Sequence, residues 1–449
     1  MTLSNCVDSQ HQYFSFRFTP LEILEKILDK AVKKSDFSLK NVGIVYIHHA
    51  LATSINVIDA MIRLGALPQN IFVLGKKYSE CNAVVENIKK YGVYYQTCSE
   101  QLGLGQFGYS FTRDINWLWK QVHDSSPEVE NILILDHGGY ATSFVPAPIL
   151  RRYKVVGVEK TTAGLIKLSE YGLPPFPLIS MATSATKKIL ESPLIADAIT
   201  DKLLSLISKK IDMVCGVIGY GAIGKALSEK LLAMGYQVIV YDCNAVSSIA
   251  LGVNYTHNLS HLIDVSDYIF GCTGQNIIKD LDPILYSEKD KTMISCSSED
   301  KEFLSLLRAI QKEGNTSVVN VLDEVRYTTR KGGVIRILKG GFPVNFDNSG
   351  ESVPREDIQL TRALVLCSIL QATQFFIKGE LLGKAGIYAL DPSLQAFVAT
   401  QWLKKQPNGR FSMQTINNFQ LPDWILKNSG GECKPCGALQ HYISEYNSV

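Results

Sequence analysis

Residues 211–244 constrain the fold most, because an apolar run, a glycine-rich turn, a helical pattern and a second apolar run follow one another there. Met213 to Ile218 has the composition of a fully buried parallel strand. Gly219, Gly221 and Gly224 then give the spacing G-x-G-x-x-G. In this spacing the first glycine makes a tight turn, the second lets the backbone approach a pyrophosphate, and the third lets the next helix pack closely on the strand.

The residues after the glycines complete a site for a dinucleotide. Ala222 and Ile223 stand at the start of the helical pattern, where free backbone amides attract an anion. Asp242 closes the second strand, Gln237 to Tyr241, at the place where an acidic side chain accepts ribose hydroxyls. Because a carboxylate there repels a 2′-phosphate, the sequence predicts NAD rather than NADP as the cofactor.

A second match to the same spacing, at Gly103, Gly105 and Gly108, lacks this context. It follows the polar run Gln96 to Gln101, and Tyr109 to Thr112 does not resemble a helix start. We therefore expect an ordinary loop there.

The composition is typical of a soluble globular protein. At 449 residues the chain is too long for one core, and two or three domains are expected. A net charge of +2 gives no electrostatic argument for nucleic acid or an anionic membrane surface as a partner. The N-terminus lacks a signal-peptide pattern, and ten cysteines without dense spacing indicate a reducing cytoplasm. Cys433 and Cys436 form C-x-x-C without a second pair at matching spacing, so no metal site is predicted.

Short apolar runs alternate with amphipathic stretches over the first 190 residues, which predicts a second parallel α/β sheet. Ser192 and Pro193 have the pattern of a helix start, a capping hydroxyl followed by proline. We expect a hinged α/β protein with a substrate domain (1–191), a Rossmann NAD-binding domain on a six-stranded sheet (192–346), a return helix packed on the substrate domain (347–385), and a C-terminal helix and tail (386–449). A small-molecule substrate and a homo-oligomer, dimer or tetramer, complete this expectation.

From about His48 to Lys404, the order of motifs resembles the S-adenosylhomocysteine hydrolase family. The matching stretches, which cover about four fifths of the chain, are residues 49–61, LILDHGG, GVEKTTAG, TKK, the glycine fingerprint, CTG and VNF. The resemblance implies a tightly bound NAD that oxidises a ribose 3′-hydroxyl, after which homocysteine is eliminated, water is added and the ketone is reduced again.

The resemblance carries over to most cofactor contacts. It places Gly219, Gly221, Gly224, Thr161, Thr162, Thr273 and Asn345 against NAD, with Asp242 where the family usually has glutamate. The substrate side departs from the family. His49 and Lys187 match an active-site histidine and the lysine that assists removal of the 3′-hydroxyl proton, with Glu191 in place of aspartate.

Other substrate positions have changed charge. The family's catalytic aspartate is His137 here, and its ribose-binding glutamate is Lys160, although Glu159 is adjacent. The family's histidine after the fifth cofactor strand is replaced near Ser298, and its G-H-P that contacts adenine is replaced by Ser349 to Val353. Such changes would leave buried groups unpaired in a site built for adenosine.

We therefore expect NAD-dependent oxidation of a secondary alcohol of a nucleoside thioether or related polyol. In this hypothesis Lys187 is the base, His49 and His137 are proton carriers, and Glu159 and Lys160 bind substrate. Lys187 and Glu191, four residues apart, fit a plain helix-surface ion pair equally well. Two alternatives stay open: a non-catalytic NAD-binding regulator, and an ordinary NAD-dependent dehydrogenase that releases NADH.

Overall fold

The computed structural model describes residues 19–98, 104–125, 128–207, 213–244, 249–278, 280–313, 316–317, 322–377 and 385–406. By their internal contacts these residues form two compact units. Unit 1 comprises Met1–Cys98, Thr112–Glu191 and Asn348–Val449, and unit 2 comprises Ser99–Phe111 and Ser192–Asp347. Cys433, Cys436 and the C-terminal tail lie outside the described residues.

Unit 1 is built on a sheet of seven strands in the order β15-β6-β5-β4-β1-β2-β3, all paired in parallel. Its strands are β1 (Val42–His48), β2 (Ile71–Gly75), β3 (Tyr94–Gln96), β4 (Asn131–Asp136), β5 (Lys154–Glu159), β6 (Pro177–Ser180) and β15 (Gly386–Ala389). The central strands are buried on both faces, which explains their continuous apolar composition. The sequence predicted β1 to β5 but not the four-residue strands β6 and β15, of which β15 forms one edge of the sheet.

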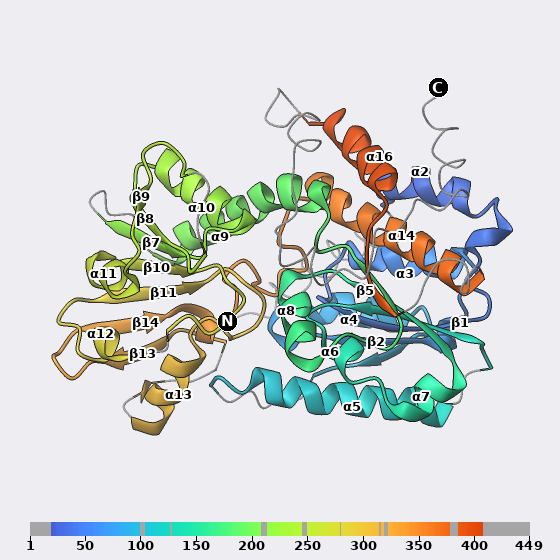
Figure 1. The fold of residues 1–449 in the computed structure, drawn as a ribbon, viewed down its shortest axis with the longest axis horizontal. Coiled ribbons are helices and arrows are strands. Elements are labelled where there is room, and N and C mark those ends of the chain that lie inside the picture. The colour runs from blue at the N-terminus through green and yellow to red at the C-terminus, as the bar shows by residue number, and fades with distance from the viewer. Residues whose placement is uncertain are drawn as a thin grey trace, which may run out of the picture. The chain divides into compact units, whose positions relative to one another are not determined.

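Helices cover both faces of this sheet, with α3 and α14 on one side and α5 and α7 on the other (Figure 1). The helices are α2 (Glu22–Ala31), α3 (Ser54–Arg63), α4 (Asn82–Lys89), α5 (Phe107–Ser125), α6 (Tyr140–Ser143), α7 (Ala147–Arg152), α8 (Thr162–Tyr171), α14 (Arg355–Ile377) and α16 (Pro392–Leu403). Helix α14 is long and apolar enough to cross a membrane, but 83% of its most apolar window is buried against α2, α3, α16 and β5, as in a core helix.

Unit 2 contains a sheet of eight strands in the order β12-β13-β14-β11-β10-β7-β8-β9. Its strands are β7 (Val214–Ile218), β8 (Gln237–Tyr241), β9 (Asn254–Tyr255), β10 (Tyr268–Gly271), β11 (Lys291–Ser295), β12 (Thr316–Ser317), β13 (Val325–Thr328) and β14 (Val334–Ile337). Six strands pair in parallel in the order β9-β8-β7-β10-β11-β14, which is the doubly wound order of a Rossmann fold. Strands β13 and β12 extend the sheet beyond β14 and pair in antiparallel fashion. The predicted six-stranded core is therefore present, with an antiparallel addition.

Separate apolar cores lie on the two faces of the unit 2 sheet. Its helices are α9 (Ser192–Leu206), α10 (Ala222–Ala233), α11 (Leu259–Val265), α12 (Asp282–Leu285) and α13 (Leu304–Glu313). Leucines and isoleucines of α11, α12 and α13 form one core, and those of α9 and α10 form the other. The fold is thus the expected α/β class, a Rossmann unit plus a second α/β unit.

One local prediction was wrong. Helix α5 begins at Phe107, so the stretch after Gly105 is a helix start, and Leu104 and Phe107 belong to unit 2. The predicted helix start at Ser192 agrees with α9, which begins at this residue directly after the π-helical turn Lys187–Glu191. Pro193 cannot donate a backbone hydrogen bond, and an irregular turn accommodates that loss within a helix.

Candidate functional site: a glycine turn in unit 2 and a histidine pair in unit 1

The three fingerprint glycines in unit 2 each meet a different spatial demand. Gly219 has a φ of +96°, and a Cβ there would lie 2.8 Å from Thr273 Cγ2. A Cβ on Gly224 would lie 1.8 Å from the Gly219 carbonyl oxygen, so only glycine allows α10 to pack this closely. Gly221 has an ordinary φ of −73°, and a Cβ there would meet nothing within 4 Å. The open space at Gly221 is the space that a closely approaching pyrophosphate needs.

The start of helix α10 offers donors to an anion in that space. Gly221 and Ala222 are exposed, Ile223 is partly exposed, and the first amides of a helix have no partner within it. Asp242 follows β8 and accepts from the Tyr220 amide at 2.7 Å and from the Asn244 amide at 2.8 Å. Its carboxylate is partly exposed and keeps lone pairs for ribose hydroxyls. The residues present therefore fit the adenosine diphosphate half of NAD.

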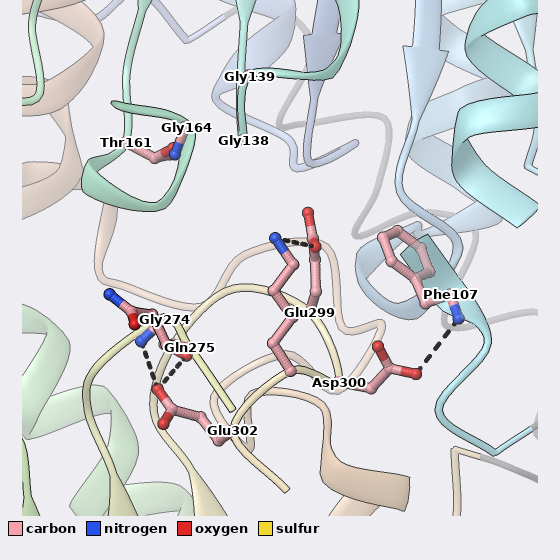
Figure 2. A network of polar contacts seen from close by, with 12 residues as sticks. Phe107, Gly138, Gly139, Thr161, Gly164, Gly274, Gln275, Glu299, Asp300 and Glu302 are labelled. Atoms are coloured by element: carbon pink, nitrogen blue, oxygen red, sulfur yellow. Dashed lines mark hydrogen bonds and ion pairs between the residues drawn. The ribbon is translucent and has the colours of Figure 1, made fainter. Parts of the chain in front are cut away.

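Thr273 follows β10, and its hydroxyl is already engaged inside the protein. It donates to Glu302 Oε2 at 2.9 Å, and the Thr273 amide donates to Glu302 Oε1 at 2.7 Å. The Gly274 amide donates to the same Oε1 at 2.6 Å (Figure 2). Ser297 Oγ donates to the same oxygen at 2.5 Å. Glu302 is fully buried, and burial raises the pKa of its carboxyl. The sequence analysis missed Glu302, which holds the turn that packs on Gly219.

The predicted NAD contact Asn345 lies in a buried turn of unit 2 after β14. Its neighbour Val344 donates its amide to the Ser295 carbonyl at the end of β11 at 3.3 Å. Asn345 is therefore held beside the carboxyl ends of the parallel strands, where ligands of open α/β sheets bind.

In unit 1, two predicted histidines meet directly. His49 follows β1 and His137 follows β4, and their Nε2 atoms lie 3.0 Å apart. Ser79, just after β2, contacts His49 Nδ1 at 2.5 Å. Burial lowers the pKa of both imidazoles well below 6.5. The charges of Lys76 and Lys160 lower the pKa of both rings further, so both rings are neutral near pH 7.

Lys160 lies at the carboxyl end of β5 with its ammonium inside the unit. Its Nζ donates to the Ile47 carbonyl at 2.8 Å and lies 4.6 Å from the centre of the Tyr46 ring. Burial lowers the pKa of Lys160 to about 7, the neighbouring Glu159 carboxylate acts in the opposite direction, and Arg362 lowers it further. Lys160 is thus a buried amine whose charge changes near neutral pH.

Glu159, which the sequence predicted to bind substrate, is engaged by donors of the protein itself. Its carboxylate is fully buried and accepts from the amides of Gly138, Gly139 and Thr161 at 3.2, 2.9 and 2.7 Å. The Thr161 hydroxyl is a fourth donor at 2.6 Å. The four donors belong to the protein and occupy the carboxylate, so Glu159 ties the end of β5 to the turn after β4. Burial and the neighbouring Asp136 raise the pKa of Glu159 to about 7.

The remaining predicted residues of unit 1 lie around helix starts. The Thr161 hydroxyl accepts from the Gly164 amide at 3.0 Å and so caps α8, and Thr162 is exposed beside it (Figure 2 labels Thr161 and Gly164).

Lys187 and Glu191 form an ion pair within the π-helical turn, and their side chains are only 23% and 10% exposed. The pair is therefore not a plain surface ion pair. Glu191 also accepts from Thr361 Oγ1 at 2.7 Å.

Comparison with known proteins finds a family model that matches the region around the glycine turn. Residues 199–276 match the NAD-binding domain of D-isomer specific 2-hydroxyacid dehydrogenases. Unit 2 is an NAD-binding domain. The cofactor is NAD, in agreement with the geometry at Gly221 and Asp242.

The relatives that match over more than half of this chain have low sequence identity to it. A protein of Mycobacterium tuberculosis described as uncharacterized is 28% identical over 361 residues, which is 77% of this chain and 67% of that protein. The adenosylhomocysteinase of Sulfolobus acidocaldarius is 25% identical over 301 residues, 64% of this chain and 69% of its own. That of Thermoplasma volcanium is 22% identical over 286 residues, 61% and 67% of the two chains. An NAD-complexed D-isomer specific 2-hydroxyacid dehydrogenase from Lactobacillus delbrueckii has a TM-score of 0.36 at 14% identity, covering 75% of this chain and 98% of that one. At 22% and 25% identity, the resemblance to the adenosylhomocysteinases is distant.

The sequence analysis also missed polar residues around the histidine pair in unit 1. Ser79 and Lys76 follow β2, and both are buried. Arg362 of α14 donates from Nε to Thr53 Oγ1 at 3.0 Å, and Thr53 donates its amide to Glu351 Oε2 at 3.0 Å. A search for polar residues at the carboxyl ends of all predicted strands would have found Ser79 and Lys76. Within the described residues, no group of three or more His, Cys, Asp or Glu is placed to hold a metal ion.

Proposed function

We propose that this protein oxidises a secondary alcohol of a nucleoside thioether or a related polyol, with NAD as the oxidant and the His49–His137 pair as the proton acceptor. When bound, NAD supplies the acceptor for the hydride that leaves the carbinol carbon. Unit 1 supplies the group that takes the hydroxyl proton. The relatives named adenosylhomocysteinase support the nucleoside thioether as substrate class, and the altered charges at His137 and Lys160 favour a compound other than S-adenosylhomocysteine itself.

One observation carries the choice of proton acceptor. His137 is neutral, and its Nδ1 has no hydrogen-bond partner among the described residues, whereas its Nε2 is engaged by His49. A neutral imidazole nitrogen without a partner is ready to accept a proton. Lys187, the base that the sequence predicted, is less suited, because its Nζ is already engaged by the Glu191 carboxylate.

The test measures the redox state of the cofactor in the whole protein. Purified protein with NAD is mixed with S-adenosylhomocysteine, other nucleoside thioethers, ribonucleosides and polyols, and NADH absorbance is recorded. We expect at least one secondary alcohol to reduce the cofactor, and His137→Gln to slow that reduction by about 100-fold or more, as for loss of a general base. If no compound in these classes reduces NAD, or if His137→Gln reacts at the wild-type rate, the proposal fails.

A second candidate, an ordinary dehydrogenase, is favoured by the match of residues 199–276 to 2-hydroxyacid dehydrogenases. The same experiment separates the two. A cycle that returns the hydride predicts transient reduction and, for a thioether, release of a free thiol detectable with a thiol reagent. A dehydrogenase predicts stoichiometric release of NADH into solution and no thiol.

A further inference from the structure

The contacts of Ser79, His49 and His137 fix where the protons lie between them. Ser79 is 1% exposed, and its Oγ lies 3.0 Å from the Lys76 carbonyl oxygen and 2.5 Å from His49 Nδ1. A carbonyl oxygen can only accept, so the single Ser79 hydroxyl proton is donated to Lys76. Ser79 Oγ is then the acceptor in its second contact, and His49 carries its proton on Nδ1.

The same reasoning extends to His137. A neutral imidazole has one protonated and one unprotonated nitrogen, so His49 Nε2 holds a lone pair. His49 Nε2 lies 3.0 Å from His137 Nε2, and a hydrogen bond at this distance requires a proton on His137 Nε2. The lone pair of His137 is therefore on Nδ1. All three hydrogen bonds point in one direction, from His137 through His49 and Ser79 to the Lys76 carbonyl.

We infer that Ser79 is a positioning residue that selects the tautomers of His49 and His137 and thereby leaves His137 Nδ1 as the proton acceptor. The tautomers follow from the contacts alone, and their role in catalysis rests on the function proposed above. In that reaction the hydroxyl proton of the substrate moves to His137 Nδ1, the O–H bond breaks, and its electron pair forms the carbonyl as hydride leaves the carbon. His137 keeps its proton on Nε2, and the hydrogen bond to the unprotonated His49 Nε2 stabilises the resulting imidazolium.

The geometry also shows why the hydroxyl of Ser79 is needed. Without it, His49 Nδ1 loses the acceptor that holds its proton, and the opposite tautomer, with a proton on Nε2, becomes accessible. Two Nε2–H groups cannot face each other at 3.0 Å, so His137 would then have to move its own proton to Nδ1. The atom that should accept the substrate proton would be blocked.

Nitrogen NMR of the full-length protein labelled with ¹⁵N-histidine tests the tautomers without any substrate. The signals are assigned with the variants His49→Gln and His137→Gln. We expect His49 to be protonated on Nδ1 and His137 on Nε2 in the wild-type protein at neutral pH. The opposite tautomer on either ring would overturn the inference, whether or not the protein oxidises an alcohol.

Substitutions of Ser79 then test its positioning role. Ser79→Ala should give mixed tautomers on both rings, whereas Ser79→Thr, which retains the hydroxyl, should preserve the wild-type pattern. Ser169→Ala is the matched control, because Ser169 also donates to the carbonyl three residues earlier, Ile166, but lies on the exposed face of α8. Unchanged tautomers in a folded Ser79→Ala protein would refute the inference. If Ser79→Ala shifts the tautomers but alcohols never reduce NAD, the positioning role stands and only the proposed function fails.

Discussion

A substitution at the single residue Gly221 should weaken cofactor binding without destabilising the fold. A Cβ at this position meets no atom of the protein and the backbone is in an ordinary conformation, so Gly221→Ala should fold with unchanged or slightly raised stability. The added methyl group would occupy the space that the pyrophosphate needs. We therefore expect NAD affinity, measured by isothermal titration calorimetry, to fall by about tenfold or more, a loss of about 1.4 kcal/mol.

Gly224→Ala is the contrasting variant at the same turn. Its Cβ would lie 1.8 Å from the Gly219 carbonyl oxygen, so the helix must shift and the melting temperature should fall even without NAD. Wild-type affinity in Gly221→Ala would contradict the placement of the pyrophosphate.

Lys160 gives the stability of unit 1 a dependence on pH. Its pKa is about 7 in the folded protein and about 10.4 in an unfolded chain, so between these values the unfolded state binds more protons. The free energy of unfolding then rises with pH through this window, by up to about 1.4 kcal/mol per pH unit from this group. Below pH 7 the full penalty of burying the ammonium remains.

The variant Lys160→Met lacks this contribution. In urea unfolding at pH 7, 8 and 9, wild-type stability should increase relative to Lys160→Met as the pH rises. Lys154→Met, at the exposed amino end of the same strand, should run parallel to the wild type. Parallel curves for Lys160→Met would show that Lys160 keeps its charge over this range.

Glu302 determines how two elements of unit 2 meet. Its carboxylate, directly before α13, holds the turn after β10 through the amides of Thr273 and Gly274. In Glu302→Gln one buried oxygen that accepts hydrogen bonds becomes an NH₂ group that cannot accept, and we expect this loss to cost about 1–3 kcal/mol. Because Thr273 packs on Gly219, we expect weaker NAD binding as well as a lower urea midpoint.

Glu288→Gln is the control for Glu302→Gln, since Glu288 forms an exposed ion pair with Lys331. Such a pair contributes about 0–1 kcal/mol. If Glu302→Gln were as mild as Glu288→Gln in both measurements, Glu302 would not hold the turn.

Sequence patterns predicted the elements whose bounds are set by neighbouring residues. They did not predict the elements whose bounds depend on contacts with distant parts of the chain. The glycine turn from β7 to α10 was predicted because its glycines are required by the backbone conformation and close packing of the turn itself. Helix α5 was missed because its start depends on unit 2, where Asp300 accepts from the Phe107 amide at 3.3 Å and Phe107 packs on Phe342 (Figure 2 shows the Asp300 bond). Strand β15 was missed because it is four residues long and pairs with β6.

The candidate site shows the same division. His49 and His137 were found because they end apolar runs, and the carboxyl ends of parallel strands share one edge of the sheet. The hydrogen bond between the two histidines, and its direction set by Ser79, could not be predicted. Both depend on side-chain positions in the loops that follow three different strands. The occupation of Glu159 by four protein donors likewise has no signal in the sequence around it.

At the scale of the whole molecule, the two units bury separate cores, so ligand binding should stabilise them unequally. A ligand at 100 times its dissociation constant stabilises the state that binds it by about 2.7 kcal/mol, which is about a 100-fold reduction in opening. NAD should therefore slow hydrogen exchange of amides in β7, α10 and β8, where exchange requires unit 2 to open. Peptides from β1 and β4 supply the internal comparison. Gly221→Ala at the same NAD concentration should lose most of the slowing. Protection confined to β1 and β4 would place the cofactor in unit 1 and contradict the assignment of unit 2.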